Sequence, residues 1–264
     1  MRITDCHAHI FPAKIAEKAT EGIGRFYDKE MRYLGSPDVL LESGRKAGVT
    51  RFWVHSVATT PHQVSSINHF IAEQCAAHPE FVGFGTLHPG SDDIERDVNE
   101  LIGLGLRGVK IHPDFQRFNI DDDSAVEMYR LFAGKLPILV HLGDDRYDFS
   151  HPRRMAHALD LVPDLVCVGA HMGGYRVWEE GFEYLGGKNC WVDTSSTLGM
   201  MNDYDRARAL VKRFGTDRMI FGVDFPMWDH AEELERFSRL GIRGDALEKV
   251  LWRNAETALT EKPF

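Results

Sequence analysis

Two histidines in the first segment of the chain carry metal-ligand chemistry. His7 and His9 stand one residue apart in residues 3–9, a run that predicts a β-strand. Alternate side chains on a strand point to the same face, so both imidazoles share a face with Asp5. Neutral imidazole nitrogens held side by side are typical ligands of a divalent metal. We therefore expect other parts of the chain to supply the remaining ligands.

The elements that would position these ligands recur along the whole chain. Short runs rich in Val, Ile, Leu and Phe alternate with stretches of helical periodicity, which indicates eight strand–helix units. Continuous apolar runs are typical of strands buried on both faces, and the intervening helices favour parallel pairing. The sequence therefore predicts an α/β fold, a closed (β/α)8 TIM barrel. The runs after the first strand are residues 50–57, 81–87, 106–112, 136–142, 165–171, 190–195 and 219–225.

Histidines gather at the ends of these strands. The carboxyl ends of all eight strands meet at one mouth of a TIM barrel, where the chemistry of this fold is found. A backbone carbonyl that satisfies a buried ring explains one such histidine but not the set. Asp224 closes the eighth strand, and seven of the 13 histidines stand at strand exits, namely His7, His9, His55, His88, His112, His141 and His171.

Four of these strand ends carry motifs that resemble the amidohydrolase superfamily. The motifs are Asp5-x-His7-x-His9, Leu139-Val140-His141, Gly169-Ala170-His171-Met172-Gly173-Gly174 and Phe221-Gly222-Val223-Asp224-Phe225-Pro226. Within the superfamily the chain looks most like the amidohydrolase-related branch that includes aminocarboxymuconate semialdehyde decarboxylase. The resemblance implies a TIM barrel of the metal-dependent hydrolase type. Because this branch contains both hydrolases and nonoxidative decarboxylases, membership does not decide the reaction.

The resemblance also implies a metal centre. We expect one divalent metal, with one position open for water, held by His7, His9, His141 and Asp224. Imidazoles with a carboxylate favour Zn²⁺, with Mn²⁺ and Fe²⁺ as alternatives. The pKa of the bound water would fall to about 7, which makes hydroxide available at neutral pH. His171 would orient or deprotonate this water, and Asp224 would pass a proton to the leaving group.

Lys110 and His112 share one face of the fourth strand and point into the barrel or toward its mouth. A buried lysine is costly unless it is paired or modified. Other branches of the superfamily carry on this strand a carboxylated lysine that bridges two metals. We favour one metal, with Lys110 as an ammonium paired with a carboxylate or with the substrate. His112 is expected to orient the substrate or to cap the strand before Pro113.

Two segments depart from the barrel rhythm and are candidates for substrate contacts. Residues 11–48 are longer than any later connection and predict an extended lid-like loop over the mouth, with an extra rim helix as the alternative. Residues 143–154 directly follow the expected ligand His141. Arg146 and Tyr147 in this segment are candidates to contact the substrate, because an arginine fork binds a carboxylate through two parallel hydrogen bonds.

Composition and charge exclude several classes of protein. The net charge of −9 disfavours a nucleic-acid surface, which needs clustered Lys and Arg. No apolar run is long enough for a membrane span, and the first strand begins at residue 2, without room for a cleaved signal peptide, so we expect a cytoplasmic protein.

No linker divides the chain, and residues 1–264 are expected to form a single domain. The four cysteines lack CxxC spacing, which favours buried free thiols.

Three functions stay open. The first is hydrolysis of an amide, ester or lactone in a small organic molecule by metal hydroxide. The second is metal-dependent nonoxidative decarboxylation of an unsaturated or aromatic carboxylic acid. The third is a non-catalytic binding module, which the complete ligand set disfavours. A homodimer is the assembly that the resemblance suggests, with Trp228 either at the contact between copies or packed over the mouth of its own barrel.

Overall fold

The computed structural model describes residues 1–261 and contains eight strands that alternate with helices. Each strand comes from one of the apolar runs, and all eight are short. The strands are β1 (Thr4–His9), β2 (Arg51–His55), β3 (Phe81–Thr86), β4 (Gly108–Ile111), β5 (Ile138–Val140), β6 (Cys167–Gly169), β7 (Cys190–Asp193) and β8 (Met219–Ile220).

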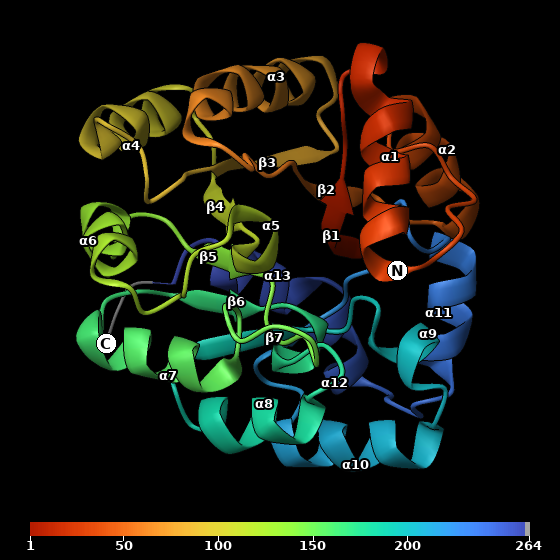
Figure 1. The fold of residues 1–264 in the computed structure, drawn as a ribbon. Helices are drawn as coiled ribbons and strands as arrows, with labels where there is room; N and C mark the ends of the chain where they lie inside the picture. The colour runs from red at the N-terminus through yellow and green to blue at the C-terminus, as the bar shows by residue number, and fades with distance from the viewer. Residues whose placement is uncertain (262–264) are drawn as a thin grey trace.

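Most helices surround this sheet on its outer side, while α5 and α13 lie over its two ends (Figure 1). Those in the first half of the chain are α1 (Ala13–Tyr27), α2 (Pro37–Ala47), η1 (Pro61–Gln63), α3 (Val64–Ala77), α4 (Ile94–Gly103), α5 (Pro113–Gln116) and α6 (Asp123–Phe132). Those in the second half are α7 (Pro152–Leu161), η2 (His171–Gly173), α8 (Trp178–Leu185), α9 (Thr197–Met201), α10 (Tyr204–Phe214), α11 (His230–Ser238), α12 (Asp245–Glu248), η3 (Lys249–Arg253) and α13 (Asn254–Ala258).

The sheet closes on itself, as the sequence predicts for a TIM barrel. Neighbours in the order β1 to β8 pair in parallel. The last strand then returns to the first, because the Cys6 amide donates to the Phe221 carbonyl at 3.0 Å and the Asp224 amide donates to the His7 carbonyl at 2.8 Å. The prediction of a (β/α)8 barrel is confirmed, and the seam of the barrel runs beside His7 and Asp224.

The interior of the barrel is apolar at one end and polar at the other. Residues two apart on a strand share a face, so Trp53 and His55 on β2 both point inward. At the apolar end, Trp53 stacks on Phe84 with ring centroids 4.7 Å apart. The polar residues therefore rest on a buried apolar layer and lie at the mouth, where the side chains of His55 and Lys110 are fully buried.

Several predicted boundaries differ from the structure. The segment 11–48 forms the helices α1 and α2, as in the rim-helix alternative, and α2 begins at Pro37 behind the N-cap Ser36. The fourth and fifth strands end one residue before His112 and His141. The sixth and eighth strands end before His171 (φ 59°) and Asp224 (φ 70°), which have left-handed backbones that a strand cannot contain.

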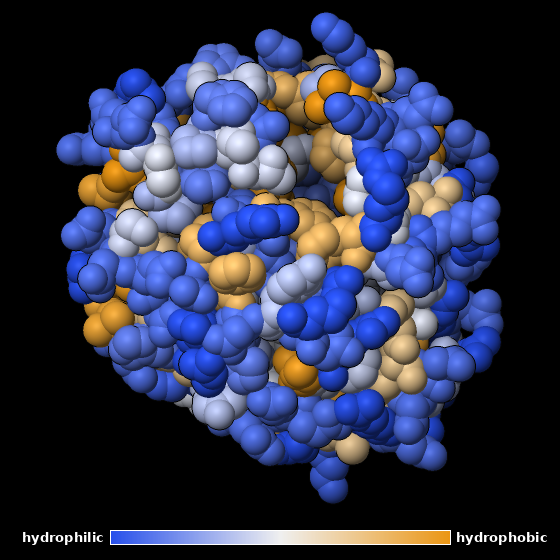
Figure 2. All heavy atoms as spheres, in the orientation of Figure 1, coloured by the Kyte–Doolittle hydropathy of each residue, from blue (hydrophilic) through white to orange (hydrophobic). Residues whose placement is uncertain are grey.

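The face in view in Figure 2 is mostly hydrophilic, with apolar residues around a hollow between α1 and α3. Within residues 1–261 no helix is long and apolar enough to cross a membrane. The four cysteines are free, and Cys6, Cys167 and Cys190 are buried while Cys75 is half-buried.

Candidate metal centre

Three predicted ligands converge at the mouth of the barrel. The Nε2 atoms of His7 and His9 each lie 3.5 Å from Oδ1 of Asp224. Nitrogen and oxygen ligands about 2.0–2.2 Å from a tetrahedral ion are about 3.3–3.6 Å apart, so these spacings match those that a bound Zn²⁺ imposes. The three side chains come from β1 and from the segment after β8, which meet at the barrel seam.

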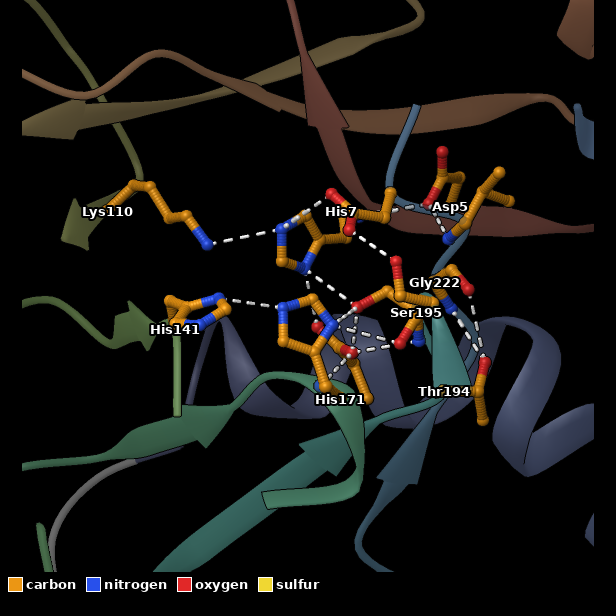
Figure 3. A network of polar contacts seen from close by, with 12 residues as sticks. Asp5, His7, Lys110, His141, His171, Thr194, Ser195 and Gly222 are labelled. Carbon is orange, nitrogen blue, oxygen red and sulfur yellow. Dashed lines mark hydrogen bonds and ion pairs between the residues drawn. The ribbon is translucent and has the colours of Figure 1, made fainter. Parts of the chain in front are cut away.

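The predicted ligand His141 lies against His171, with Nδ1 and Nε2 of the two rings 2.9 Å apart (Figure 3). A carbonyl oxygen accepts only, so the contact of His171 Nδ1 with the Ser195 carbonyl (2.9 Å) puts a proton on Nδ1. The contact of His141 Nε2 with the Gly143 carbonyl (2.9 Å) likewise puts the His141 proton on Nε2. Two nitrogen lone pairs then face each other, which favours a proton or a metal ion at this edge of the pocket.

Asp193, at the end of β7, orients the rings of this centre and was missed from the sequence. Its Oδ2 accepts from His7 Nδ1 at 2.9 Å, which directs the Nε2 lone pair of His7 into the pocket. Its Oδ1 accepts from the backbone amides of His171 and Ser195, both at 2.9 Å, and from the Ser195 hydroxyl. The sequence did contain a sign of this role, because Asp193 stands at the end of a predicted strand, as Asp224 does.

Asp224 has a partner of its own. The Ser196 hydroxyl donates to Asp224 Oδ2 at 2.5 Å, and Trp228 Nε1 donates to the Ser196 hydroxyl at 2.9 Å. Asp224 Oδ1 is thereby left to face the two histidines. Trp228 is buried in this contact and packs over its own barrel, the second of the two placements considered for it.

Burial and neighbouring charges set the protonation of these groups. Burial, with the charge of Lys110, lowers the pKa of His7 to about 4, so this ring is neutral at pH 7. Burial alone would raise the pKa of Asp224, but the His7 and His9 rings hold it well below its usual range. Burial likewise opposes ionisation of Asp193, but His7 holds its pKa at about 2. The centre therefore offers neutral imidazoles and ionised carboxylates.

Lys110 reaches into this centre from β4. Its Nζ lies 3.2 Å from His7 Nε2 (Figure 3), and its side chain is fully buried. Burial lowers the pKa of Lys110 to about 8, with Asp193 and Asp224 opposing the shift. The amine therefore still carries a positive charge at neutral pH for most of the time. Its polar contact is with the His7 ring, and its pairing with a carboxylate or with the substrate stays a prediction.

Three other strand-exit histidines take different places. His55 packs its ring against His9 with centroids 4.3 Å apart, and neither of its nitrogens has a hydrogen-bond partner among the described residues. His112 stacks on His141 at 3.8 Å with nearly parallel rings, and its Nδ1 caps α5 by accepting from the Phe115 amide. His88 lies away from the centre, where it accepts from the Gly90 amide.

Asp5, which shares the strand face of His7, does not face the pocket. It accepts from His230 Nε2 at 3.0 Å and from the amides of His7 and Val223, both at 2.9 Å. Its carboxylate therefore ties β1 to the segments after β8 instead of offering a ligand.

The end of α1 closes the pocket from above. Tyr27 donates or accepts a hydrogen bond with His112 Nε2 at 2.8 Å, and the pocket under it has a volume of about 10 Å³. Arg146 lies outside, where its guanidinium binds Asp144 at 2.7 Å and the Phe26 carbonyl at 2.7 Å. Tyr147 is 43% exposed on the same rim. Arg146 thus ties the segment after β5 to α1, and its contact with substrate stays a prediction.

A scan of protein families matches the Amidohydrolase family over residues 4–259. The chain belongs to the amidohydrolase family. The resemblance stated from the four motifs is therefore confirmed, and so is the expectation of an enzyme that works with a metal. A search of curated proteins found no significant match.

Solved structures share the fold of this amidohydrolase over nearly its full length. An uncharacterised TIM-barrel protein from Bordetella bronchiseptica is 21% identical with a TM-score of 0.77, covering 98% of this chain and 99% of its own. A dihydroxybenzoic acid decarboxylase from Polaromonas, with bound manganese and an inhibitor, is 15% identical with a TM-score of 0.73 (98% and 96% covered). A candidate 2-pyrone-4,6-dicarboxylic acid hydrolase from Pseudomonas putida is 17% identical with a TM-score of 0.67 (98% and 97% covered).

The side chains of this amidohydrolase fit a divalent ion. The 3.5 Å spacings around Asp224 suit a tetrahedral ion, the two facing lone pairs of His141 and His171 call for a positive charge, and His7 is held by a carboxylate behind it. All of these side chains except Asp193 line one small pocket.

Proposed function

We propose that this amidohydrolase is a metal-dependent hydrolase that acts on an amide, ester or lactone in a small organic molecule. The observation that carries the proposal is the ring of His171. Because its Nδ1 proton is held by the Ser195 carbonyl, its Nε2 lone pair faces the pocket, beside His141 Nδ1 at 2.9 Å. A neutral imidazole at this position is suited to take a proton from an attacking water.

The ion would be held by His7, His9, His141 and Asp224, the set that the family resemblance implies. A divalent ion there supplies Lewis-acid polarisation of a substrate oxygen. Imidazoles with a carboxylate favour Zn²⁺. Mn²⁺ is the alternative supported by the manganese in the Polaromonas decarboxylase. A second ion bridged by a carboxylated Lys110 would need the neutral amine, and its pKa of about 8 leaves that form in the minority at neutral pH.

Each of the other side chains has a part in the proposed hydrolysis. His171 takes the proton from water and can return it to the leaving group. Asp193 accepts from Nδ1 of the His7 ring and from the backbone N–H of His171, so it orients the ring of the first and the backbone of the second. Asp224 is ionised near pH 7, which suits it as a ligand, and its part as a proton carrier stays a prediction.

The charge of the site favours an anionic substrate or transition state. Around the pocket Asp193 and Asp224 are negative, Lys110 is positive, and Asp114, 3.6 Å from His141, has a pKa that burial raises to about 7. The sum lies between one and two negative charges, and a divalent ion would turn it into a small positive charge. The Lys110 ammonium is the cation nearest the predicted ligands, so a substrate carboxylate would be attracted toward it.

Decarboxylation of an aromatic or unsaturated acid is the second candidate. The buried charge of Lys110 favours it, because that reaction must bind a carboxylate. The structural likeness to a dihydroxybenzoic acid decarboxylase also favours it. In this reaction a protonated His171 would deliver the proton to the carbon that loses CO₂.

A paired assay separates the two reactions. The Zn²⁺- or Mn²⁺-loaded protein is incubated with lactones, esters and amides while acid release is followed at constant pH, and with hydroxybenzoates while CO₂ is followed. We expect acid release that His171→Asn abolishes while Arg153→Gln, a control on the exposed start of α7, retains it. CO₂ release from hydroxybenzoates without acid release from the first panel would reject hydrolysis in favour of decarboxylation.

A further inference from the structure

A second cavity adjoins the metal centre on the side of α1 and α3. It has a volume of about 480 Å³, within the range of small-molecule sites, and is lined by these two helices and by the segments that follow β1 and β2. Figure 2 shows the hollow between α1 and α3, bordered by apolar residues. We call this cavity the α1–α3 groove.

The groove adjoins the metal centre, with which it shares part of its wall. His9, Ile23 and Phe115 line both the groove and the pocket beneath Tyr27. That pocket has a volume of about 10 Å³, roughly the room of one water molecule, so it holds the reacting group of a substrate and little more. When the reacting group of a substrate lies at His9, the groove is the nearest space for the rest of the molecule.

The lining of the groove is mostly apolar and carries no Asp, Glu, Lys or Arg. Phe11, Phe26, Phe70 and Phe115 contribute four aromatic rings, and all four are only partly buried. Charged residues make up 27% of the chain, so sixteen residues drawn at random would include about four. Among the sixteen described residues that line the groove none is Asp, Glu, Lys or Arg. A carboxylate or ammonium placed there would lose its hydration without gaining an ionic partner.

We infer that the α1–α3 groove binds an uncharged apolar part of the substrate, an alkyl chain or an aromatic ring, while the reacting group lies at His9. The inference rests on the proposed function, and it narrows the substrate class to molecules whose far end is not ionised. A molecule with a second carboxylate at that end is excluded.

Gly22 offers a clean way to fill the groove. It lies on α1 among the lining residues, and a Cβ built on it meets only the Arg25 guanidinium, at 3.9 Å. Gly22→Leu therefore enters the groove without a backbone clash, and leucine favours a helix more than glycine does. The matched control is Gly103→Leu at the end of α4, where a Cβ meets nothing within 4 Å and the residue is exposed.

The first test uses N-phenyl-1-naphthylamine, an uncharged aromatic fluorophore, and needs no metal and no turnover. We expect saturable binding to the metal-free protein, weakened at least about tenfold by Gly22→Leu and unchanged by Gly103→Leu. Ala19→Leu, one turn earlier on α1, should act like Gly22→Leu, and circular dichroism checks that each variant is folded. Absence of binding to the parent protein, or equal binding to all variants, overturns the inference.

The second test asks which end of a ligand the groove accepts. Calorimetry on the Mn²⁺-loaded protein compares heptanoate with pimelate, which differs by a second carboxylate at the far end. We expect heptanoate to bind at least about tenfold more tightly, and Gly22→Leu to remove this preference. Equal or tighter binding of pimelate overturns the inference. Failure of the proposed hydrolysis would show itself separately, as absence of acid release with fluorophore binding intact.

Discussion

Asp193→Asn provides a quantitative test of how the metal centre is built. The carboxylate accepts His7 Nδ1–H on one oxygen and three further donors from His171 and Ser195 on the other. An asparagine has one acceptor oxygen and one NH₂ group. The oxygen stays with the two backbone amides at lower cost, so the NH₂ would face His7 Nδ1 and drive the His7 proton to Nε2.

That change removes the His7 lone pair from the pocket. Loss of a residue that orients a metal ligand typically lowers affinity 10–100-fold, which corresponds to about 1.4–2.8 kcal/mol. We expect a weakening of this size for Zn²⁺ in competition with a chromophoric chelator. Because the contact is buried on both sides, little screening by salt is expected.

Asp97→Asn on α4 is the matched control. It is also a buried carboxylate, but it accepts from Ser91 and Arg96 and is remote from the pocket in the fold. Its Zn²⁺ affinity should stay within about twofold of the parent, a difference below about 0.4 kcal/mol. An Asp193→Asn protein that folds normally and binds Zn²⁺ as tightly as this control would refute the assigned orienting role.

The metal-free protein should lose stability as the pH falls from 7 to 5. Burial lowers the pKa of five histidines at the mouth, namely His7, His9, His55, His112 and His141, so in this range the unfolded chain binds more protons than the folded protein does. The His7 ring, with a pKa of about 4, removes about 1.4 kcal/mol by pH 5.5, while Asp114 and Glu233, whose pKa burial raises to about 7, oppose the loss. Urea unfolding should therefore show a positive slope of stability with pH that His55→Leu reduces, and a flat profile would contradict this. Arg146→Ala removes a hydrogen bond to the end of α1, and hydrogen exchange there should become roughly tenfold faster, while Arg25→Ala, on the exposed face of that helix, should leave it unchanged. Elemental analysis of His171→Asn should still find about one metal per chain while turnover falls about 10²–10⁴-fold, and loss of the metal would make His171 a ligand instead.

The barrel and the residues at its mouth were accessible from the sequence because both depend on local patterns. An apolar run bounded by a helical stretch defines a strand, and the residue that closes the run lies at the mouth whatever the exact boundary. This is why the sequence could place His7, His9, His141, His171 and Asp224 at the mouth, where they line one pocket, although several strands end early.

What the sequence did not reveal depends on contacts between distant segments. Asp193 gains its role only because β7 lies beside the seam that brings His7 to it, 186 residues away. Arg146 binds Asp144 on the same short loop and the Phe26 carbonyl on α1, and the sequence pattern did not reveal this tie between two segments. For residues 11–48 the sequence left a lid-like loop and a rim helix as alternatives, and the structure has the helices α1 and α2 there.

The closure of the barrel at the metal centre has a consequence for how the protein is made. His7 and His9 leave the ribosome early, whereas Asp224 follows more than two hundred residues later, and the backbone bonds between these segments are the last to complete the sheet. A nascent chain that ends before Asp224 lacks both the carboxylate and the neighbouring strand that orient the first two histidines. Ion capture is therefore expected as a late event in biogenesis, which marks the passage from a partly folded chain to a finished barrel.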